Sequence, residues 1–160
     1  MRWHAFAEAC PEIAALAEER FRHDQLLLVG TIRGDGSPRI SPNECDLAGG
    51  ELFIGMMWQS RKAVDLARDP RCVLHSVPSD KDNPGGDVKI SGRAVDIQDA
   101  GLRQVYREAI KARIDWEPEE PNYHCFAMDV DSAAYIVFGD DRRVMTWDAA
   151  RGLRRLPFPE

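Results

Sequence analysis

The hydrophobic positions of this chain fall mostly into short runs that turn-forming residues separate, which is the pattern of β-strands. Residues 25–33 are apolar on both sides of an extended chain, as expected for a strand buried on both faces. Pro38 and Pro42 cannot donate to a strand ladder, so their strand is irregular or lies at a sheet edge. Gly92 marks a bend or bulge in the long alternating run around it. The predicted strands are residues 25–33, 38–47, 52–58, 71–77, 87–97, 123–130, 133–139 and 142–148.

Three segments carry the three- and four-residue spacing of helices instead. Residues 3–22 have one apolar stripe, and Pro11 divides them into two short helices because proline suits a first helical turn. Residues 60–68 predict a short helix that ends before Pro70. Residues 99–113 predict the last helix, again with its apolar side chains on one face.

Antiparallel strands joined by short turns, with few helices, predict a barrel or a sandwich. No glycine-rich dinucleotide motif follows a strand and no P-loop is present, which argues against both nucleotide-binding classes. We expect a single domain over residues 1–160. It would comprise an N-terminal helical segment at 1–23, a barrel core at 24–97, a helix at 99–113 and closing strands at 122–156.

The composition and charge of the chain limit the kinds of partner that it can bind. The 160 residues are 44% hydrophobic, enough for one domain with a core. The net charge of −6 disfavours binding to nucleic acid or to an anionic membrane. No apolar run approaches the roughly 20 residues that span a bilayer. Arg2 and His4 interrupt the region where a signal peptide needs an unbroken apolar core, so we expect a cytoplasmic protein.

The cysteines and histidines do not have the spacing of a metal site. The four cysteines are widely separated and form no C-x-x-C pair, so we interpret them as buried reduced thiols. His124 and Cys125 are neighbours in sequence and would point to opposite faces of a strand. We therefore expect no metal site.

The segment that begins the 60–68 helix carries the clearest candidate chemistry. Ser60 is a good N-cap residue, and the free N–H groups and dipole of a helix start favour an anion. Arg61 and Lys62 add two cationic donors at the same place. The segment is therefore a candidate phosphate site of a cofactor or nucleotide. On the tripeptide alone, a capped surface helix with two solvated cations is the alternative interpretation.

Four motifs occur in a recognisable order along the middle of the chain. They are Gly30-Thr-Ile-Arg-Gly-Asp-Gly-Ser-Pro-Arg39, Gly50-Glu-Leu-Phe-Ile-Gly55, Ser60-Arg-Lys-Ala-Val-Asp-Leu-Ala-Arg-Asp-Pro70 and Val88-Lys-Ile-Ser-Gly-Arg-Ala94. With them the chain resembles the pyridoxamine 5′-phosphate oxidase-like, flavin-binding split β-barrel family. The resemblance implies a mainly β (α+β) fold, an antiparallel Greek-key split β-barrel with flanking helices. It also implies a homodimer with the cofactor at the interface.

The resemblance assigns roles to residues of four predicted elements. In the family the Ser-Arg-Lys element binds the flavin phosphate, so Ser60, Arg61 and Lys62 would hold it here. Residues of the second and third predicted strands would lie against the ring or the ribityl chain, and a lysine of the fifth would approach the ring or a substrate. The resemblance gives these positions to Ser41, Pro42, Asn43, Gly55, Met56 and Lys89. It names no catalytic acid.

The implied cofactor is flavin mononucleotide (FMN), with a deazaflavin coenzyme as the alternative. The motif that defines pyridoxamine phosphate oxidases proper on the second strand is replaced here by Ser41-Pro-Asn-Glu-Cys-Asp46. The favoured interpretation is an FMN-dependent oxidoreductase acting on a small organic substrate. A deazaflavin-dependent reductase of the same fold is one alternative, and a non-catalytic flavin sensor or storage protein is another. The candidate ring-stacking or substrate-lining aromatics are Trp58, Tyr106, Trp116, Tyr123 and Trp147, with packing as the preferred interpretation for each.

Overall fold

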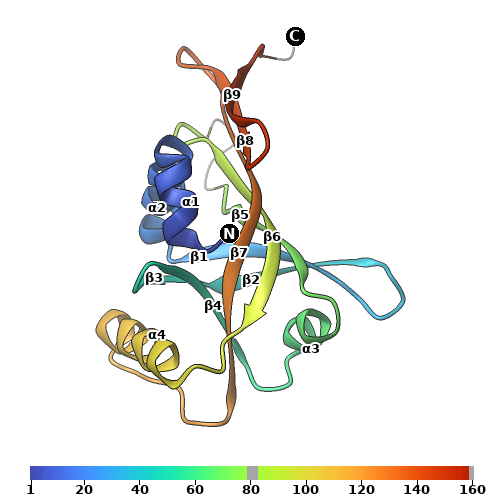
Figure 1. Cartoon of the computed structure of the whole chain (residues 1–160), viewed down its shortest axis with the longest axis vertical. Coiled ribbons are helices and arrows are strands. Elements are labelled where there is room, and N and C mark those ends of the chain that lie inside the picture. The colour runs from blue at the N-terminus through green and yellow to red at the C-terminus, as the bar shows by residue number, and fades with distance from the viewer. Residues whose placement is uncertain (79–82, 159–160) are drawn as a thin grey trace.

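Within the part of the chain that the structure describes, alternation of buried and exposed positions along the extended segments produces one antiparallel sheet of nine strands. The computed structural model describes residues 1–78 and 83–158, which Figure 1 shows in ribbon form. The strands are β1 (Leu26–Ile32), β2 (Pro38–Glu44), β3 (Asp46–Ala48), β4 (Glu51–Met57), β5 (Arg71–Ser76), β6 (Asp87–Asp96), β7 (Tyr123–Val137), β8 (Arg143–Asp148) and β9 (Gly152–Leu156). The helices are α1 (Trp3–Ala9), α2 (Pro11–Asp24), α3 (Arg61–Arg68) and α4 (Ala100–Ile114).

The strand order is β2-β1-β5-β6-β7-β4-β3, and β8 and β9 extend from β7. β7 is long enough to have two neighbours along one side. Its first residues pair with β4, and its last residues pair with β8. The β8–β9 hairpin therefore projects beyond the barrel, at the top of Figure 1. The opposite end of the sheet positions the candidate site.

The sheet curls so that β2 and β4 approach each other without a regular ladder. A side-chain hydrogen bond joins them, since Asn43 Nδ2 donates to Gly55 O at 3.1 Å. This gap is the split of a split barrel, and it leaves backbone groups of two strand edges unpaired. The predicted fold class is confirmed.

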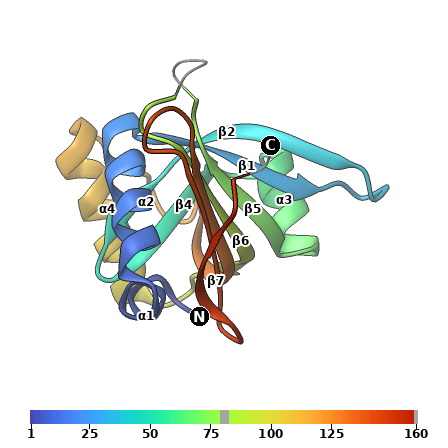
Figure 2. The ribbon, with the colours of Figure 1, turned by 90° about the horizontal axis from the view of Figure 1, so that it is seen from above.

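Two apolar clusters hold the layers together. The helices α1 and α2 pack along one side of the sheet, where Figure 2 shows them beside the strands. They contribute Trp3, Phe6 and Phe21 to the larger cluster, and Phe6 packs edge-on against Trp147 at 5.0 Å between ring centroids. The smaller cluster lies between α4 and strands β4 and β7, with Tyr106 among its members. Both clusters exclude water from the strands that border the site.

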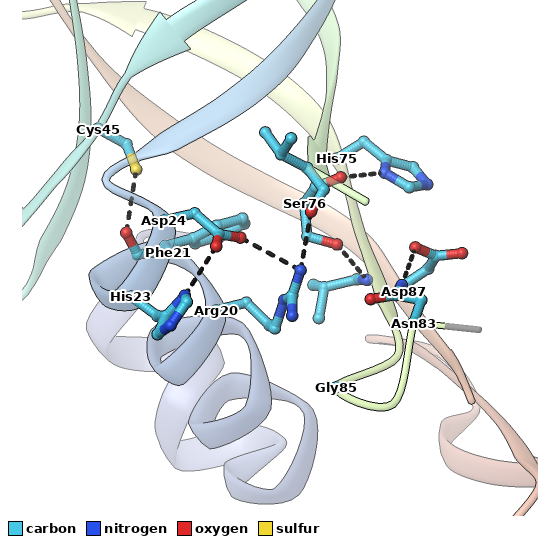
Figure 3. A network of polar contacts seen from close by, with 12 residues as sticks. Arg20, Phe21, His23, Asp24, Cys45, His75, Ser76, Asn83, Gly85 and Asp87 are labelled. Carbon is cyan, nitrogen blue, oxygen red and sulfur yellow. Dashed lines mark hydrogen bonds and ion pairs between the residues drawn. The ribbon is translucent and has the colours of Figure 1, made fainter. Parts of the chain in front are cut away.

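A polar network fixes α2 against the ends of β5 and β6 (Figure 3). Arg20 donates to the carbonyl of Val77 at 2.8 Å and pairs with Asp24 at 3.2 Å. Ser76 Oγ accepts from the Val88 N–H at 3.0 Å. These bonds satisfy backbone groups at the point where the two strands separate.

Several expectations from the sequence are confirmed and others are wrong. The break at Pro11, the short helix after Ser60 and the bulge at Gly92 are all present. The two strands expected over 123–130 and 133–139 are one continuous strand, β7. The strand expected over 38–47 divides into β2 and β3, and β9 was not anticipated.

The expectation that residues 25–33 are buried on both faces is wrong for this chain. In β1, Leu27 and Val29 are fully buried, whereas Leu26 is 42% exposed and Leu28 is half-buried. No helix of the described residues is long and apolar enough to cross a membrane. All four cysteines are free and buried, as predicted.

Candidate functional site

A cavity of about 780 Å³ opens where the ends of β2 and β4 meet α3, α4 and residues 114–123. Its volume is in the range of small-molecule sites. The cofactor-binding residues of the sequence analysis that line it are Pro42, Asn43, Gly55, Met56 and Lys62. Residues from three separate elements, β2, β4 and α3, therefore meet at one place, because the split of the barrel brings β2 beside β4.

The start of α3 presents unused polar groups at the edge of this cavity. Ser60 is at the N-cap, as predicted, but its hydroxyl makes no capping bond. Ser60 Oγ is buried and has no hydrogen-bond partner among the described residues. The first-turn N–H groups of a helix also lack intrahelical partners. A phosphate would satisfy both sets of groups.

Two cations, Arg61 and Lys62, flank that position and differ in the contacts that they make. The Arg61 side chain is exposed, and it forms no hydrogen bond or ion pair with any part of the chain that the structure describes. Lys62 Nζ donates to the carbonyl of Pro42 at 2.6 Å. Burial lowers the pKa of the Lys62 ammonium, and the nearby Glu44 carboxylate partly offsets this. Arg61 is thus free for an anion, while Lys62 also ties α3 to β2.

A buried carboxylate on α3 fixes the helix that carries these groups. Asp65 is 6% exposed and accepts from Arg39 Nε at 2.7 Å and from Thr31 Oγ1 at 3.0 Å. Arg39 lies in β2 and Thr31 in β1, so the contact joins α3 to the β1–β2 hairpin. Asp65 had no role assigned from the sequence. The signal was present, because Arg39 and Asp65 belong to two of the four motifs.

Four predicted residues lie outside the cavity lining: Ser60 and Arg61 at the start of α3, described above, and Ser41 and Lys89. Ser41 is the neighbour of Pro42 in β2 and pairs with Val29 in the strand register. Lys89 is exposed in β6, on the same row of the sheet as His75 and Pro42. Three strand intervals, about 14 Å at the usual strand spacing, separate Lys89 from Pro42. Within one chain, the structure does not bring Lys89 to the cavity.

The far wall of the cavity comes from α4 and from residues 114–123. Tyr106 of α4 packs over Gly55, where a Cβ atom would lie 1.4 Å from the tyrosine oxygen. Trp116 and Tyr123 line the same wall. Of the five aromatics named from the sequence, these three face the cavity, whereas Trp147 is in the core and Trp58 stacks on His124 at 4.7 Å.

Ion pairs hold the 114–123 segment against α4. Arg103 pairs with Glu120 at 2.7 Å, and Tyr123 Oη donates to the same carboxylate at 2.6 Å. Arg107 pairs with Glu117 at 3.2 Å. Hydrogen bonds from Arg103 and Tyr123 lower the pKa of Glu120 from 4.5 to about 2. The acidic run of this segment is therefore an anchored wall of the cavity.

Comparison with known protein families gives a match over most of the chain. Residues 13–137 match the family described as pyridoxamine 5′-phosphate oxidase. A search of curated proteins gives no significant match.

Solved structures of low sequence identity share the fold. A pyridoxamine 5′-phosphate oxidase-related, FMN-binding protein from Nostoc punctiforme superposes with a TM-score of 0.67 at 12% identity, covering 94% of this chain and 96% of the other. PhzG from Burkholderia lata, solved with tetrahydrophenazine-1-carboxylic acid, superposes with a TM-score of 0.69 at 13% identity, covering 95% of this chain and 93% of PhzG. A heme-binding protein from Mycobacterium smegmatis superposes with a TM-score of 0.64 at 17% identity. The match covers 84% of this chain but only 57% of the heme-binding protein.

Proposed function

Because this chain belongs to the pyridoxamine 5′-phosphate oxidase family, we propose that it binds FMN in the cavity between β2, β4 and α3. We propose further that it is an oxidoreductase acting on a small organic substrate. The observation that carries the proposal is the buried, unpartnered hydroxyl of Ser60 at the start of α3. A hydroxyl in that position gains a partner when a phosphate binds, and Arg61 supplies the neutralising charge.

The residues of this chain fit such a cofactor in two respects. The start of α3 offers a hydroxyl, helix N–H groups and Arg61 to the phosphate. The open edges of β2 and β4 offer backbone groups to the polar edge of a flat ring. Asn43 holds these two edges in place through its bond to Gly55 O. When bound, the flavin supplies the hydride chemistry, and the protein binds and orients it.

The proposal includes a homodimer in which the cofactor lies at the interface. The exposed position of Lys89, well away from the cavity of its own chain, is compatible with a contact from a second chain. A known FMN-binding protein of the same fold supports the choice of cofactor. A deazaflavin coenzyme is the alternative that the same phosphate site would accept.

The visible absorbance spectrum of the purified protein, with mass spectrometry of any molecule released on denaturation, tests the cofactor. A yellow protein that releases FMN supports the proposal, and release of a deazaflavin supports the alternative coenzyme. A Soret band, or a protein that stays colourless with both flavins, contradicts the cofactor assignment. Tight FMN binding without reduction by any nicotinamide donor would support a sensor or storage role instead of an enzyme.

The phosphate site has its own prediction. The double variant Arg61→Ala/Lys62→Ala should weaken FMN binding by about a hundredfold, because two charge-assisted contacts are lost. The matched control Arg22→Ala/Arg151→Ala removes two exposed charges elsewhere and should leave the affinity unchanged. Fluorescence titration of FMN measures both affinities. Equal affinities in the two double variants would exclude the start of α3 as the phosphate site.

A further inference from the structure

The proposed cofactor residues line only one half of the cavity. The other half lies between α4 and residues 114–123, and we call it the α4 subsite. Its walls are Tyr106, Ile110, Ile114, Trp116 and Tyr123, which are large and mostly apolar. The two halves meet at Gly55, so a molecule in the α4 subsite would lie next to the cofactor position.

One polar group in the α4 subsite has no hydrogen-bond partner among the described residues. Tyr106 is 6% exposed, and its hydroxyl lies over Gly55 on the cavity wall. Within residues 1–78 and 83–158, this hydroxyl makes no hydrogen bond. Phe53 and Tyr123 pack against the ring at 5.4 and 5.9 Å between centroids and hold it in place. Because burial raises the pKa of Tyr106, the hydroxyl keeps its proton and acts as a donor.

The indole of Trp116 lies at the mouth of the α4 subsite and is largely uncovered by the protein. Trp116 is 58% exposed although it lies in an anchored segment. Aromatic side chains contribute most when a flat apolar partner covers them. The geometry therefore offers a flat apolar surface at the mouth and a hydrogen-bond donor at the base.

The charges around the cavity disfavour an anion in this half. Glu44 and Glu119 both line the cavity. Lys62 is the one cation in the lining of the described residues, and its ammonium is bonded to Pro42 O beside α3. Glu44 is paired with Arg113 at 2.9 Å, whereas the Glu119 carboxylate has no ion pair within the described residues. An anionic ligand in the α4 subsite would therefore face Glu119 without a free cation in the described lining to compensate.

We infer that the α4 subsite binds the substrate, a planar, apolar molecule without negative charge that accepts a hydrogen bond from Tyr106. The assignment as a substrate site rests on the proposed function, because the substrate must lie beside the flavin. The ligand specificity rests on the cavity walls alone. The class includes flat heteroaromatic and carbonyl compounds and excludes phosphate esters and carboxylates.

Calorimetric titration with two matched probes tests this inference. The probes are 2-quinolone, a neutral flat carbonyl compound, and 2-quinolone-4-carboxylate, the same ring with a negative charge. Both are titrated into the purified full-length protein, with and without FMN. We expect 2-quinolone to bind and the carboxylate to bind at least about tenfold more weakly. No heat signal with either probe at millimolar concentration overturns the inference.

Two variants with matched controls link binding to the named residues. Tyr106→Phe should weaken 2-quinolone binding by about fivefold, the effect of one lost hydrogen bond. The control Tyr135→Phe changes a buried tyrosine that bonds to Gly85 O and should have no effect. Trp116→Ala should weaken binding by about tenfold. Phe138→Ala, which removes an aromatic residue of similar exposure elsewhere, should not.

The outcomes separate this inference from the proposed function. If FMN fails to bind but 2-quinolone binds through Tyr106 and Trp116, the cofactor assignment fails and the α4 subsite stands as a ligand site. If FMN binds and the two quinolones bind equally, the substrate class is wrong. Unchanged binding in both Tyr106→Phe and Trp116→Ala would also overturn the inference, and Trp116→Ala keeps the test valid if Tyr106→Phe does not fold.

Discussion

At the scale of single residues, the contact between Gly55 and Tyr106 joins the fold to the cavity. A Cβ atom on residue 55 would lie 1.4 Å from the tyrosine oxygen and 2.2 Å from its Cζ. Gly55→Ala should therefore lower the free energy of unfolding by about 2–3 kcal/mol through overpacking. Urea denaturation measures this loss. Gly34→Ala is the control, because no heavy atom lies within 4 Å of its Cβ position.

A double-variant cycle shows whether the two residues act on each other. In a Tyr106→Ala background the added methyl group has room, so Gly55→Ala should cost less than about 1 kcal/mol. An undiminished cost in that background would assign the effect to the backbone of β4 instead. The sequence placed Gly55 at the site through a resemblance. It gave no indication that a tyrosine from α4, about fifty positions along the chain, requires the glycine.

The positions of single residues were predicted well where the motif itself is local. Ser60 is at the start of a helix, and Arg61 and Lys62 follow it, as the sequence indicated. The orientation of the Ser60 hydroxyl was not predictable, since a side-chain rotamer depends on packing by other elements. Lys62 makes a contact to Pro42 that depends on the barrel closing.

At the scale of elements, α3 depends on its contact with the β1–β2 hairpin. Asp65→Ala would leave Arg39 without its carboxylate and Thr31 without its acceptor, both in a largely buried place. We expect a loss of about 2–4 kcal/mol in unfolding free energy. FMN affinity should fall as well, because the start of α3 is no longer fixed. The control Glu8→Ala removes an exposed pairing carboxylate and should change little.

The stability that the 114–123 segment gives the protein should depend on pH through Glu120. The folded-state pKa of Glu120 is about 2, below its ordinary 4.5, so the pairing stabilises the protein above pH 4.5. That stability is lost as the pH falls from 4.5 towards 2. Glu120→Gln should lower the urea midpoint at pH 7, and its difference from the wild-type protein should disappear near pH 2. A difference in urea midpoint that stays constant from pH 7 to pH 2 would show that the ionised carboxylate is not the source of the stabilisation.

Element boundaries were predicted from local sequence patterns. These predictions were wrong where pairing with a distant strand decides the boundary. Pro11 and the turn residues gave the helix break and the hairpins correctly. Residues 131–132 were predicted to interrupt a strand, but β6 pairs along both halves and keeps β7 continuous. β9 has little apolar pattern of its own and is formed by pairing with β8. Tyr106, Trp116 and Tyr123 were candidate lining residues, with packing preferred for each. That they meet in one wall was not predictable, because it depends on how α4 packs over β4.

At the scale of the whole molecule, the outer face of β1 and β2 carries more apolar surface than one chain uses. Ile40 is 73% exposed and Leu26 is 42% exposed. Leu28 and Val73 on the same face are only half-buried. This explains why the sequence of β1 is apolar on both sides although one chain buries only one of them. A second copy covering this face would account for the pattern.

We therefore predict a solution mass of twice the 18.0 kDa of one chain, measured by light scattering at micromolar concentration. Ile40→Asp should reduce the mass to that of one chain, because an uncompensated carboxylate would be buried in the interface. The variant should still fold, since the Ile40 side chain contributes little to the core, and circular dichroism checks this. If the cofactor lies at the interface, FMN affinity should fall together with the mass. A wild-type protein that is a single chain and still binds FMN tightly would place the whole site within one copy.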